Sequence, residues 1–423
     1  MGLMATPPSS EKSSPGLKLH YGRIVVAVAF LTLAIGGPVN STFAVFYVAM
    51  LEEFRWSRAD TALAFSVSML VFGVSATAVG ALIDRFGPRK VIPAGAALLS
   101  LSLALTAGVR EPWHLYLVYG VGVSLGITLI GFIPTSTVVA AWFRRRRATA
   151  MGVAMGGRGI GVLWLVPFSQ YLIASLGWRQ AYLILAALIL ATVVPLNALF
   201  QRGHPEAQGA RPPTPLPDPQ AAGRESGWNL SRAMRDLPFW ISMVTGFVQG
   251  ISFSAVMVHL VAHMVGVGYT KLFAAAALGT SAALRAAGGV AGGYLSDHVG
   301  RARGFSLCTA AALLGLFLLM AASGGERLLA WAFVLLYGLG SGGQGTIFVS
   351  QKADIFPGAR FGSILGLSQV GTGLGAALGP WVAGWIYDRF ESYYLALLMV
   401  AGAMALSAAG VWLTELASRR RKE

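Results

Sequence analysis

The stretch Leu278–Arg303, LGTSAALRAAGGVAGGYLSDHVGRAR, places a charged side chain deep inside an apolar segment. Its first part is almost entirely Ala, Gly, Leu and Val, as in a helix that crosses a bilayer. Arg285 lies within this part, far from either end. An arginine near the bilayer centre costs about 2.5–3.5 kcal/mol on insertion scales, and such residues usually face a bundle interior or a water-filled path. Arg285 is therefore the first candidate functional residue, and its charge suits a negatively charged ligand.

The composition of the whole chain is that of a membrane protein. Of its 423 residues 55% are hydrophobic and only 12% are charged, whereas soluble domains carry about 25% charged residues. The net charge of +15 would suggest nucleic acid in a soluble chain. Here the basic residues lie in short loops between apolar spans, which favours contact with anionic lipids and argues against a nucleic-acid partner.

Twelve apolar stretches are long enough to cross a membrane. They lie near residues 22–50, 60–83, 88–109, 113–141, 148–175, 179–200, 237–266, 271–295, 304–323, 328–350, 361–387 and 393–415. An even number of crossings puts both termini on one side. The loops on that side hold most of the Lys and Arg residues, including the run Arg144–Arg147, so we expect both termini in the cytoplasm and the chain in the cell membrane.

A Pro-, Gly- and charge-rich segment divides the spans six and six. We read it as a flexible cytoplasmic linker whose last part, Gly227–Asp236, forms a short interfacial helix. The expected organisation is a cytoplasmic tail (1–20), a six-helix bundle (21–200), the linker (201–236), a second six-helix bundle (237–416) and a basic cytoplasmic tail (417–423). We expect a monomer.

The two halves repeat each other weakly. The pattern G-x-L-x-D-x-x-G follows the second span from Gly80 and the eighth span from Gly293. Four glycines of the fifth span recur at equal spacings in the eleventh: Gly152, Gly157, Gly159 and Gly161 correspond to Gly366, Gly371, Gly373 and Gly375. Repeats of this kind place a substrate site near the midplane, between the halves.

The chain resembles the major facilitator superfamily. The string GALIDRFGPRK at 80–90 is similar to the motif between that superfamily's second and third spans, and the likeness covers residues 20–415. Finer detail resembles the branch of monocarboxylate porters and oxalate/formate antiporters, in MLEEFRWSRA (50–59), AMGVAMGGRGIG (150–161), GWRQAY (177–182), VHLVAHMVGVGYT (258–270) and the segment 360–388. The resemblance implies an all-α membrane fold of twelve helices in two pseudo-symmetric halves.

Two arginines are candidates for contact with a substrate. The branch's substrate-binding arginine falls at Gly289 here, and Arg285 lies one helical turn earlier on roughly the same face. Arg158 lies about ten residues into the fifth span, which the superfamily fold places opposite the eighth. A guanidinium group binds a carboxylate through two parallel hydrogen bonds. The alternatives are ties to backbone carbonyls for Arg285 and helix packing or snorkelling for Arg158.

Other polar residues in the spans are weaker candidates. Tyr119, Asn40 and Gln344 fall, by the resemblance, in spans that line the cavity, where each either holds a substrate oxygen or bridges two helices. His259 is a candidate proton carrier, since histidine titrates near neutral pH, or else a packing residue. His259 and His263 have the i, i+4 spacing of a metal pair but no third ligand in view, so we expect no metal and no cofactor.

The resemblance also implies a cytoplasmic gate. Asp84, Arg85, Arg89 and Asp297 lie where spans meet the cytoplasm, and ion pairs between the halves would hold one access state closed. The alternative is an ordinary solvated loop.

We therefore expect a secondary active transporter of small organic anions that works by alternating access with proton symport or anion exchange. The resemblance implies monocarboxylates such as lactate or pyruvate; the first alternative is an oxalate or dicarboxylate antiporter. An exporter of hydrophobic or cationic compounds is less favoured because no Asp or Glu lies in the middle of a span. A solute sensor remains a third hypothesis. Since no nucleophile–base or metal constellation appears, we do not expect an enzyme.

Overall fold

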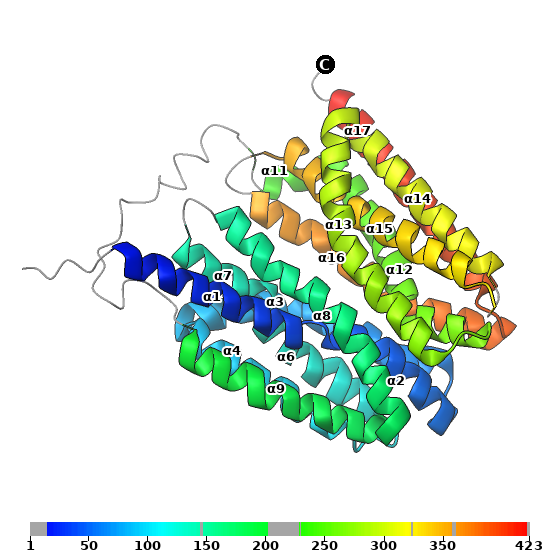
Figure 1. Cartoon of the computed structure of the whole chain (residues 1–423). Coiled ribbons are helices and arrows are strands. Elements are labelled where there is room, and N and C mark those ends of the chain that lie inside the picture. Colours follow the sequence, from blue (N-terminus) through cyan, green and yellow to red (C-terminus); the bar gives the residue numbers. More distant parts are fainter. Residues whose placement is uncertain are drawn as a thin grey trace, which may run out of the picture.

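The computed structural model describes residues 15–143, 147–201, 228, 230–322, 325–357 and 361–420, which form helices joined by short turns. The first half contains α1 (Pro15–Ile35), α2 (Val39–Phe54), α3 (Arg58–Phe86), α4 (Pro88–Thr106), α5 (Pro112–Leu115), the π-helix η1 (Tyr116–Val123), α6 (Ser124–Ile130), α7 (Phe132–Trp142), α8 (Arg147–Leu176) and α9 (Trp178–Phe200). The second half contains α11 (Leu230–Met234), α12 (Leu237–Gly266), α13 (Lys271–Val299), α14 (Arg301–Ala321), α15 (Arg327–Ile355), α16 (Phe361–Phe390) and α17 (Tyr394–Arg420). The two sets form two bundles side by side (Figure 1).

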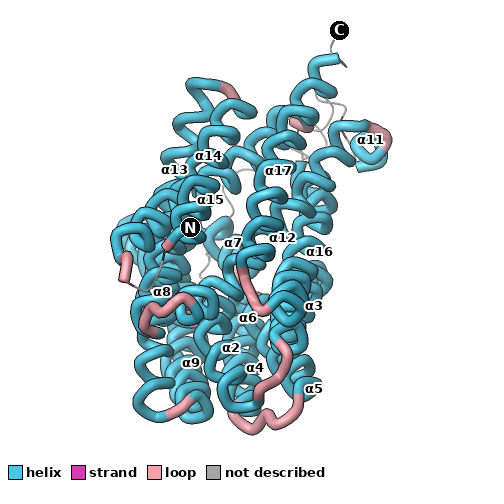
Figure 2. The backbone as a smooth tube through the Cα atoms, turned by 90° about the vertical axis from the view of Figure 1, so that its right-hand side faces the viewer, coloured by secondary structure: helices cyan, strands magenta, loops and turns pink. Residues whose placement is uncertain are grey.

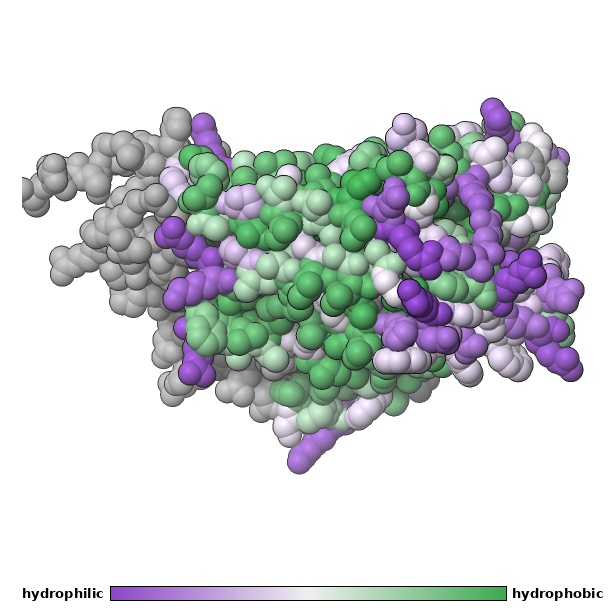
Figure 3. Space-filling view, turned by 90° about the horizontal axis from the view of Figure 1, so that it is seen from below, coloured by the Kyte–Doolittle hydropathy of each residue, from purple (hydrophilic) through white to green (hydrophobic). Residues whose placement is uncertain are grey.

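The bundles have the length and surface of a membrane protein. Eleven helical segments of the described chain are long and apolar enough to span a bilayer. The twelfth crossing is α16, whose 30 residues extend over about 45 Å and pack against α12 and α3. Figure 3 shows an apolar band between two polar rims. This arrangement agrees with the twelve predicted crossings of a multi-pass membrane protein.

The predicted linker lies mostly outside the described residues, at 202–227 and 229. Its last part contains the short helix α11, within the range expected for an interfacial helix. The run Arg144–Arg146 and the tails 1–14 and 421–423 also lie outside the described residues.

The repeated glycines have equivalent positions in the two halves. Gly157 and Gly161 of α8 lie against backbone carbonyls of α1, where a Cβ atom would collide. Gly371 and Gly375 of α16 lie in the same way against backbone carbonyls of α12. Close backbone approach is the usual reason for small residues between membrane helices. The predicted repeat of the fifth and eleventh spans therefore has a structural counterpart.

The halves touch at one end and separate toward the other. Near Arg58, a Cβ atom added to Gly384 of α16 would lie 2.8 Å from the backbone nitrogen of Ala59 in α3. Toward the opposite ends of the same two helices, Gly80 and Gly366 have no atom within 4 Å of such a Cβ. We name the two ends of the molecule the closed end, where Arg58 lies, and the open end, where Asp297 lies. Figure 2 shows α3 and α16 side by side.

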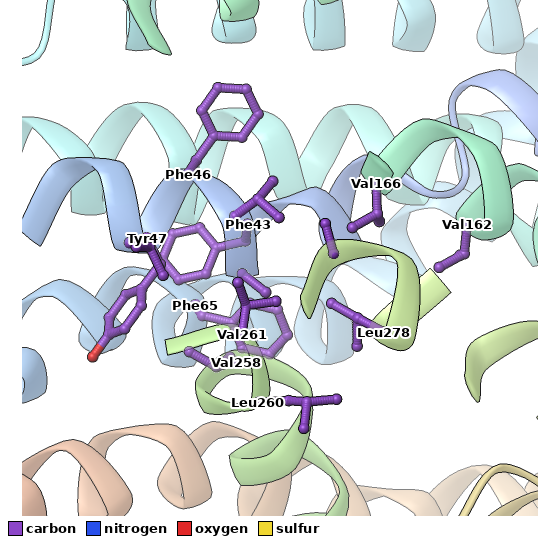
Figure 4. Close-up of a cluster of buried hydrophobic side chains, with 14 of the residues drawn as sticks. Phe43, Phe46, Tyr47, Phe65, Val162, Val166, Val258, Leu260, Val261 and Leu278 are labelled. Atoms are coloured by element: carbon purple, nitrogen blue, oxygen red, sulfur yellow. The ribbon is translucent and has the colours of Figure 1, made fainter. Parts of the chain in front are cut away.

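An apolar seal fills the interface between mid-depth and the closed end. It is formed by fully or almost fully buried side chains of α2, α3, α8, α12 and α13, namely Phe43, Phe65, Val162, Val258, Val261 and Leu278 (Figure 4). Because these side chains come from both halves, they exclude water from this part of the interface. A passage through the molecule is therefore blocked toward the closed end.

Candidate functional site

Arg158 and Arg285 lie at the same depth, just where the halves begin to separate. They belong to α8 and α13, which pack against each other. A Cβ atom added to Gly159 would lie 3.7 Å from the Cβ atom of Ala286, so the neighbours of the two arginines are in contact. The charges of the two guanidinium groups are close enough to interact. The structure thus brings together the two arginines selected from the sequence, one from each half.

The guanidinium of Arg285 is held by weak contacts and has no carboxylate partner among the described residues. Its Nη1 lies 3.5 Å from Oγ of Ser341, at the limit of a hydrogen bond. Its central carbon lies 4.0 Å from the centre of the Phe253 ring, a cation–π arrangement. Five donors with so few partners leave most of the hydrogen-bonding capacity of this group unused.

Arg158 is exposed although it lies near the middle of the molecule. No hydrogen bond or ion pair of its side chain occurs among the described residues. Gly156 and Gly152, two and six residues before Arg158 on α8, have no neighbouring atoms within 4 Å of a built Cβ. Arg158 therefore faces the space that widens toward the open end.

A cavity of about 180 Å³ lies beside Arg285, within the second half. On the same scale a single water molecule needs only about 10–15 Å³. Besides Arg285 and Ser341, the residues with polar side chains that line it are Gln249, Ser252, Tyr337, Gln344, Gln369, Thr372 and Ser407, and Phe253 adds an aromatic ring. The combination of an unpaired cation, an aromatic face and several hydrogen-bonding groups suits a polar organic anion.

The three other substrate-contact candidates differ in position. Gln344 lines the cavity, and its Nε2 donates to Oγ1 of Thr309 over 2.7 Å. Asn40 and Tyr119 are buried in the first half and are not among the residues that line this cavity. Among the described residues the Tyr119 hydroxyl and the Asn40 amide oxygen find no hydrogen-bond partner. Their role in substrate contact stays a prediction.

Tyr119 belongs to the π-helix η1, which interrupts the fourth span. Such widened turns frequently occur at functional sites. The ring of Tyr119 packs against Phe43 of the apolar seal, with ring centres 4.8 Å apart. Tyr119 therefore contacts the seal rather than the open space beside Arg158.

His259 belongs to a hydrogen-bonded chain at the closed end. Its Nε2 lies 2.8 Å from the carbonyl oxygen of Pro380, and its Nδ1 lies 3.1 Å from the hydroxyl of Tyr393. The same hydroxyl accepts a hydrogen bond of 2.6 Å from Nη1 of Arg58. The chain therefore connects α12 to α3, across the two halves.

Asp388 also lies at this end and is not among the candidates selected from the sequence. Its two carboxylate oxygens accept hydrogen bonds from the backbone N–H groups of Arg58 (2.9 Å) and Ala59 (2.8 Å), in the first turn of α3. Nearby, Lys271 of α13 forms an ion pair with Glu52 of α2. Nothing in the sequence pairs these residues, because they come from opposite halves.

The predicted gate residues lie at the open end. The side chain of Asp84 is outside the described residues, and Arg85 is exposed. Nε of Arg89 is 3.4 Å from the carbonyl oxygen of Ala198 in its own half. Asp297 pairs with Arg301, which also pairs with Asp354, again within one half. Among the described residues, none of these groups contacts the opposite half in this open arrangement.

A buried lysine is a second residue that sequence reasoning missed. Lys352 of α15 is only 2% exposed, although it lies beyond residue 350, the predicted end of that span. Its Nζ lies 3.1 Å from Oγ of Ser368 and 3.9 Å from the ring centre of Phe348, which lines the cavity. The helix α15 continues to Ile355, past the predicted end of the span, and Lys352 lies in this extension inside the bundle.

Comparison with known proteins assigns the fold and the family. Residues 28–351 match the Major Facilitator Superfamily. Monocarboxylate transporter 13 of Bos taurus is 30% identical over 394 residues, covering 93% of this chain and 89% of that protein. Monocarboxylate transporter 11 of Homo sapiens is 28% identical over 407 residues, covering 93% and 82%.

Two solved structures share the fold. A bacterial homolog of the human lysosomal transporter Spinster, in an inward-facing and unoccupied conformation, has a TM-score of 0.75 at 15% identity, covering 96% of this chain and 98% of that one. A mutant of the nucleoside transporter NupG has a TM-score of 0.75 at 14% identity, covering 93% and 99%. With the sequence matches, these likenesses show that this chain belongs to the major facilitator superfamily.

Proposed function

We propose that this protein is a secondary active transporter of small organic anions, with monocarboxylates as the first substrate class. The observation that carries the proposal is the Arg285 guanidinium, which lies at mid-depth beside a cavity and has no carboxylate partner among the described residues. The relatives named as monocarboxylate transporters support the same class.

Electrostatics explains how an anion would promote the transport cycle. Closing the open end would bring Arg158 and Arg285 into a drier space, where the repulsion between their charges grows. A carboxylate bound to Arg285 through paired hydrogen bonds neutralises one of the two charges. Closure around the loaded site is therefore easier than closure around the empty one, as alternating access with obligatory cargo requires.

We place the open end at the cytoplasm, in the cell membrane. Arg85, Arg89, Arg301 and Arg303 lie at this end, and an excess of such residues favours the cytoplasmic side. Both termini lie on the same side in this orientation. The structure then represents the state in which the site communicates with the cytoplasm.

Proton coupling is assigned to His259. A carbonyl oxygen only accepts, so we assign the proton of the neutral ring to Nε2, which donates to Pro380, and Nδ1 accepts from Tyr393. Burial raises the pKa of Tyr393, in the turn before α17, to about 12, so this hydroxyl keeps the proton it donates. A protonated ring would donate from both nitrogens and would present a second positive charge beside Arg58.

Protonation of His259 therefore opposes the closed end and favours an outward-open state. The ionisable groups around this ring are Tyr47, Tyr393 and Arg58, with His263 packed against Tyr393 and Asp388 bonded to the backbone of Arg58. No acidic group in the part of the chain that the structure describes contacts the ring directly, so nothing there stabilises its charged form in this state. External protons would therefore promote anion uptake by populating the outward-open state.

A dicarboxylate antiporter is the second candidate. Arg158 and Arg285 come from opposite halves at one depth, so each can take one end of a substrate with two acid groups. Exchange needs no proton carrier, because the returning anion neutralises the site.

Uptake into proteoliposomes tests both candidates. Labelled lactate, pyruvate and oxalate would be offered with and without a pH gradient, and with and without unlabelled anion inside. Monocarboxylate uptake driven by an inwardly directed proton gradient, with the outside more acidic, supports symport. Uptake that depends on internal oxalate supports exchange. Protein carrying Arg327→Ala, an exposed arginine at the closed end, serves as a control for Arg285→Ala. If no organic acid is transported under any of these conditions, the proposal is wrong.

A further inference from the structure

The amide side chains beside Arg285 are the part of the cavity that a simple carboxylate does not use. Gln249 of α12, Gln344 of α15 and Gln369 of α16 line the cavity from three helices. Each amide offers both donors and an acceptor. Because one carboxylate already satisfies the guanidinium, these groups are available to the rest of the substrate.

Most of this capacity is not used within the protein. Among the described residues Gln249 makes no side-chain hydrogen bond, although it is partly buried. Gln369 uses only its oxygen, which accepts from Oγ1 of Thr372 over 3.2 Å. Gln344 uses only its nitrogen, in the bond to Thr309. Free amide nitrogens and oxygens therefore face one space.

The hydroxyl groups of the cavity add acceptors. Ser252, Ser341 and Ser407 each donate to a carbonyl of their own helix, over 3.1, 3.4 and 2.8 Å. A hydroxyl oxygen that donates one hydrogen bond still has lone pairs, and that of Ser341 accepts from Arg285, so the wall can accept hydrogen bonds as well as donate them. A cavity wall with both hydrogen-bond donors and acceptors matches alcohol groups, which are themselves both donors and acceptors.

We infer that the substrate is a hydroxylated carboxylate of the sugar-acid class, larger than lactate. The inference rests on the proposed function, since the acid group binds Arg285. The carbon chain then extends from Arg285 and Phe253 toward Gln249 and Gln369, and its hydroxyl groups bond to the amides. An unsubstituted acid of equal length would displace water from these amides without forming hydrogen bonds to them. Such an acid should therefore bind more weakly.

Competition between matched acids tests this inference in proteoliposomes. D-Gluconate and hexanoate have equal chain length and differ in their hydroxyl groups, and glycerate and propionate form a shorter pair. Each unlabelled acid would compete with labelled lactate, and uptake of labelled gluconate would be measured directly. We expect gluconate to be transported, and to compete at least tenfold better than hexanoate.

Variants locate the effect at the amides. Gln249→Leu and Gln369→Leu keep side-chain size and remove hydrogen bonds, so each should weaken gluconate binding about three- to tenfold. Both variants should lower gluconate uptake more than lactate uptake, and their melting temperatures in detergent show whether they fold. Gln180→Leu, an exposed glutamine on α9, is the matched control.

Different outcomes separate this inference from the proposed function. If lactate is transported but gluconate neither enters nor competes better than hexanoate, the inference is wrong and the transporter proposal stands. If both glutamine variants lower lactate and gluconate uptake equally, the amides do not bind the hydroxyl groups of the substrate. The inference is then wrong as well. If no lactate, oxalate or gluconate is transported, both proposals are wrong.

Discussion

The carboxylate of Asp388, at the end of α16, accepts hydrogen bonds from the backbone N–H groups of Arg58 and Ala59 in the first turn of α3. A residue of one half thus caps a helix of the other. The N-terminus of a helix carries unpaired N–H groups and a partial positive charge, both of which a carboxylate satisfies. Arg58 adds a bond to Tyr393 and stacks on Tyr387, with 3.7 Å from its central carbon to the ring centre. The closed end is therefore held by contacts that an outward-open state must break.

Asp388→Ala should destabilise the closed end. Hydrogen bonds to a charged group contribute about 1.5–3 kcal/mol, so the balance between the access states should shift at least tenfold toward outward-open. Asp388→Asn keeps one acceptor and should shift it less. A membrane-impermeant thiol reagent applied from outside should label a cysteine introduced at Leu278 faster in these variants, in a Cys308→Ser background.

Asp60→Asn is the control for this measurement, because Asp60 is exposed in the same first turn of α3. It should leave the labelling rate unchanged. Equal labelling rates in wild type and Asp388→Ala would mean that this carboxylate does not hold the halves together.

Arg285→Ala should abolish anion uptake while expression stays normal. The paired hydrogen bonds to a carboxylate are lost, and we expect uptake to fall by at least a hundredfold. Arg285→Lys should recover only part of it, since an ammonium lacks the planar fork. Initial rates in proteoliposomes, normalised to protein amount, measure both variants. Uptake near the wild-type rate in Arg285→Ala would remove this residue from the site.

Arg158→Ala should affect dicarboxylates more than monocarboxylates. Arg285 alone suffices for one acid group, whereas a second acid group would lose its partner on the opposite half. We expect oxalate uptake to fall about tenfold more than lactate uptake, a difference of about 1.4 kcal/mol. Parallel measurements with both labelled acids test this. Equal losses for the two acids would argue against a pair of arginines that act together.

His259→Gln should flatten the pH dependence of uptake. Glutamine can donate to Pro380 and accept from Tyr393, as the neutral ring does, but it does not titrate. In wild type, protonation breaks the closed end, so uptake should rise as the external pH falls. The variant should keep one rate from about pH 5.5 to 7.5, a range about one unit either side of the ordinary pKa of histidine. His298→Gln, an exposed histidine at the open end, should retain the wild-type profile.

Gly157→Ala should destabilise the first half. A Cβ atom there collides with a backbone carbonyl of α1, and forced repacking costs about 1–3 kcal/mol. Gly152→Ala on the same helix meets no atom within 4 Å and should be tolerated. Thermal unfolding of the purified variants in detergent compares them. Equal melting temperatures would show that the α1–α8 contact can relax.

Much of the fold follows from patterns that are local in the chain. The apolar lengths predicted twelve crossings, the distribution of basic residues predicted an orientation, and the glycine spacings predicted the repeat. Arg285 and Arg158 stood out for the same reason, because a charge inside an apolar stretch is costly unless the fold gives it a polar surrounding. These features depend on the bilayer and on neighbours one or two helical turns away.

The tertiary structure alone decided which residues meet across the halves. Residues about 330 positions apart, such as Arg58 and Asp388, carry no mutual signal in a single sequence. The amides of Gln249 and Gln369, which the sequence did not single out, face one cavity because α12 and α16 pack together, while Tyr119, which it did, packs against an apolar seal. The sequence by itself thus determined which segments enter the membrane and which charges need a partner there. Packing of the two halves determined where those charges meet, because contact between distant segments depends on helix crossings that no local pattern encodes.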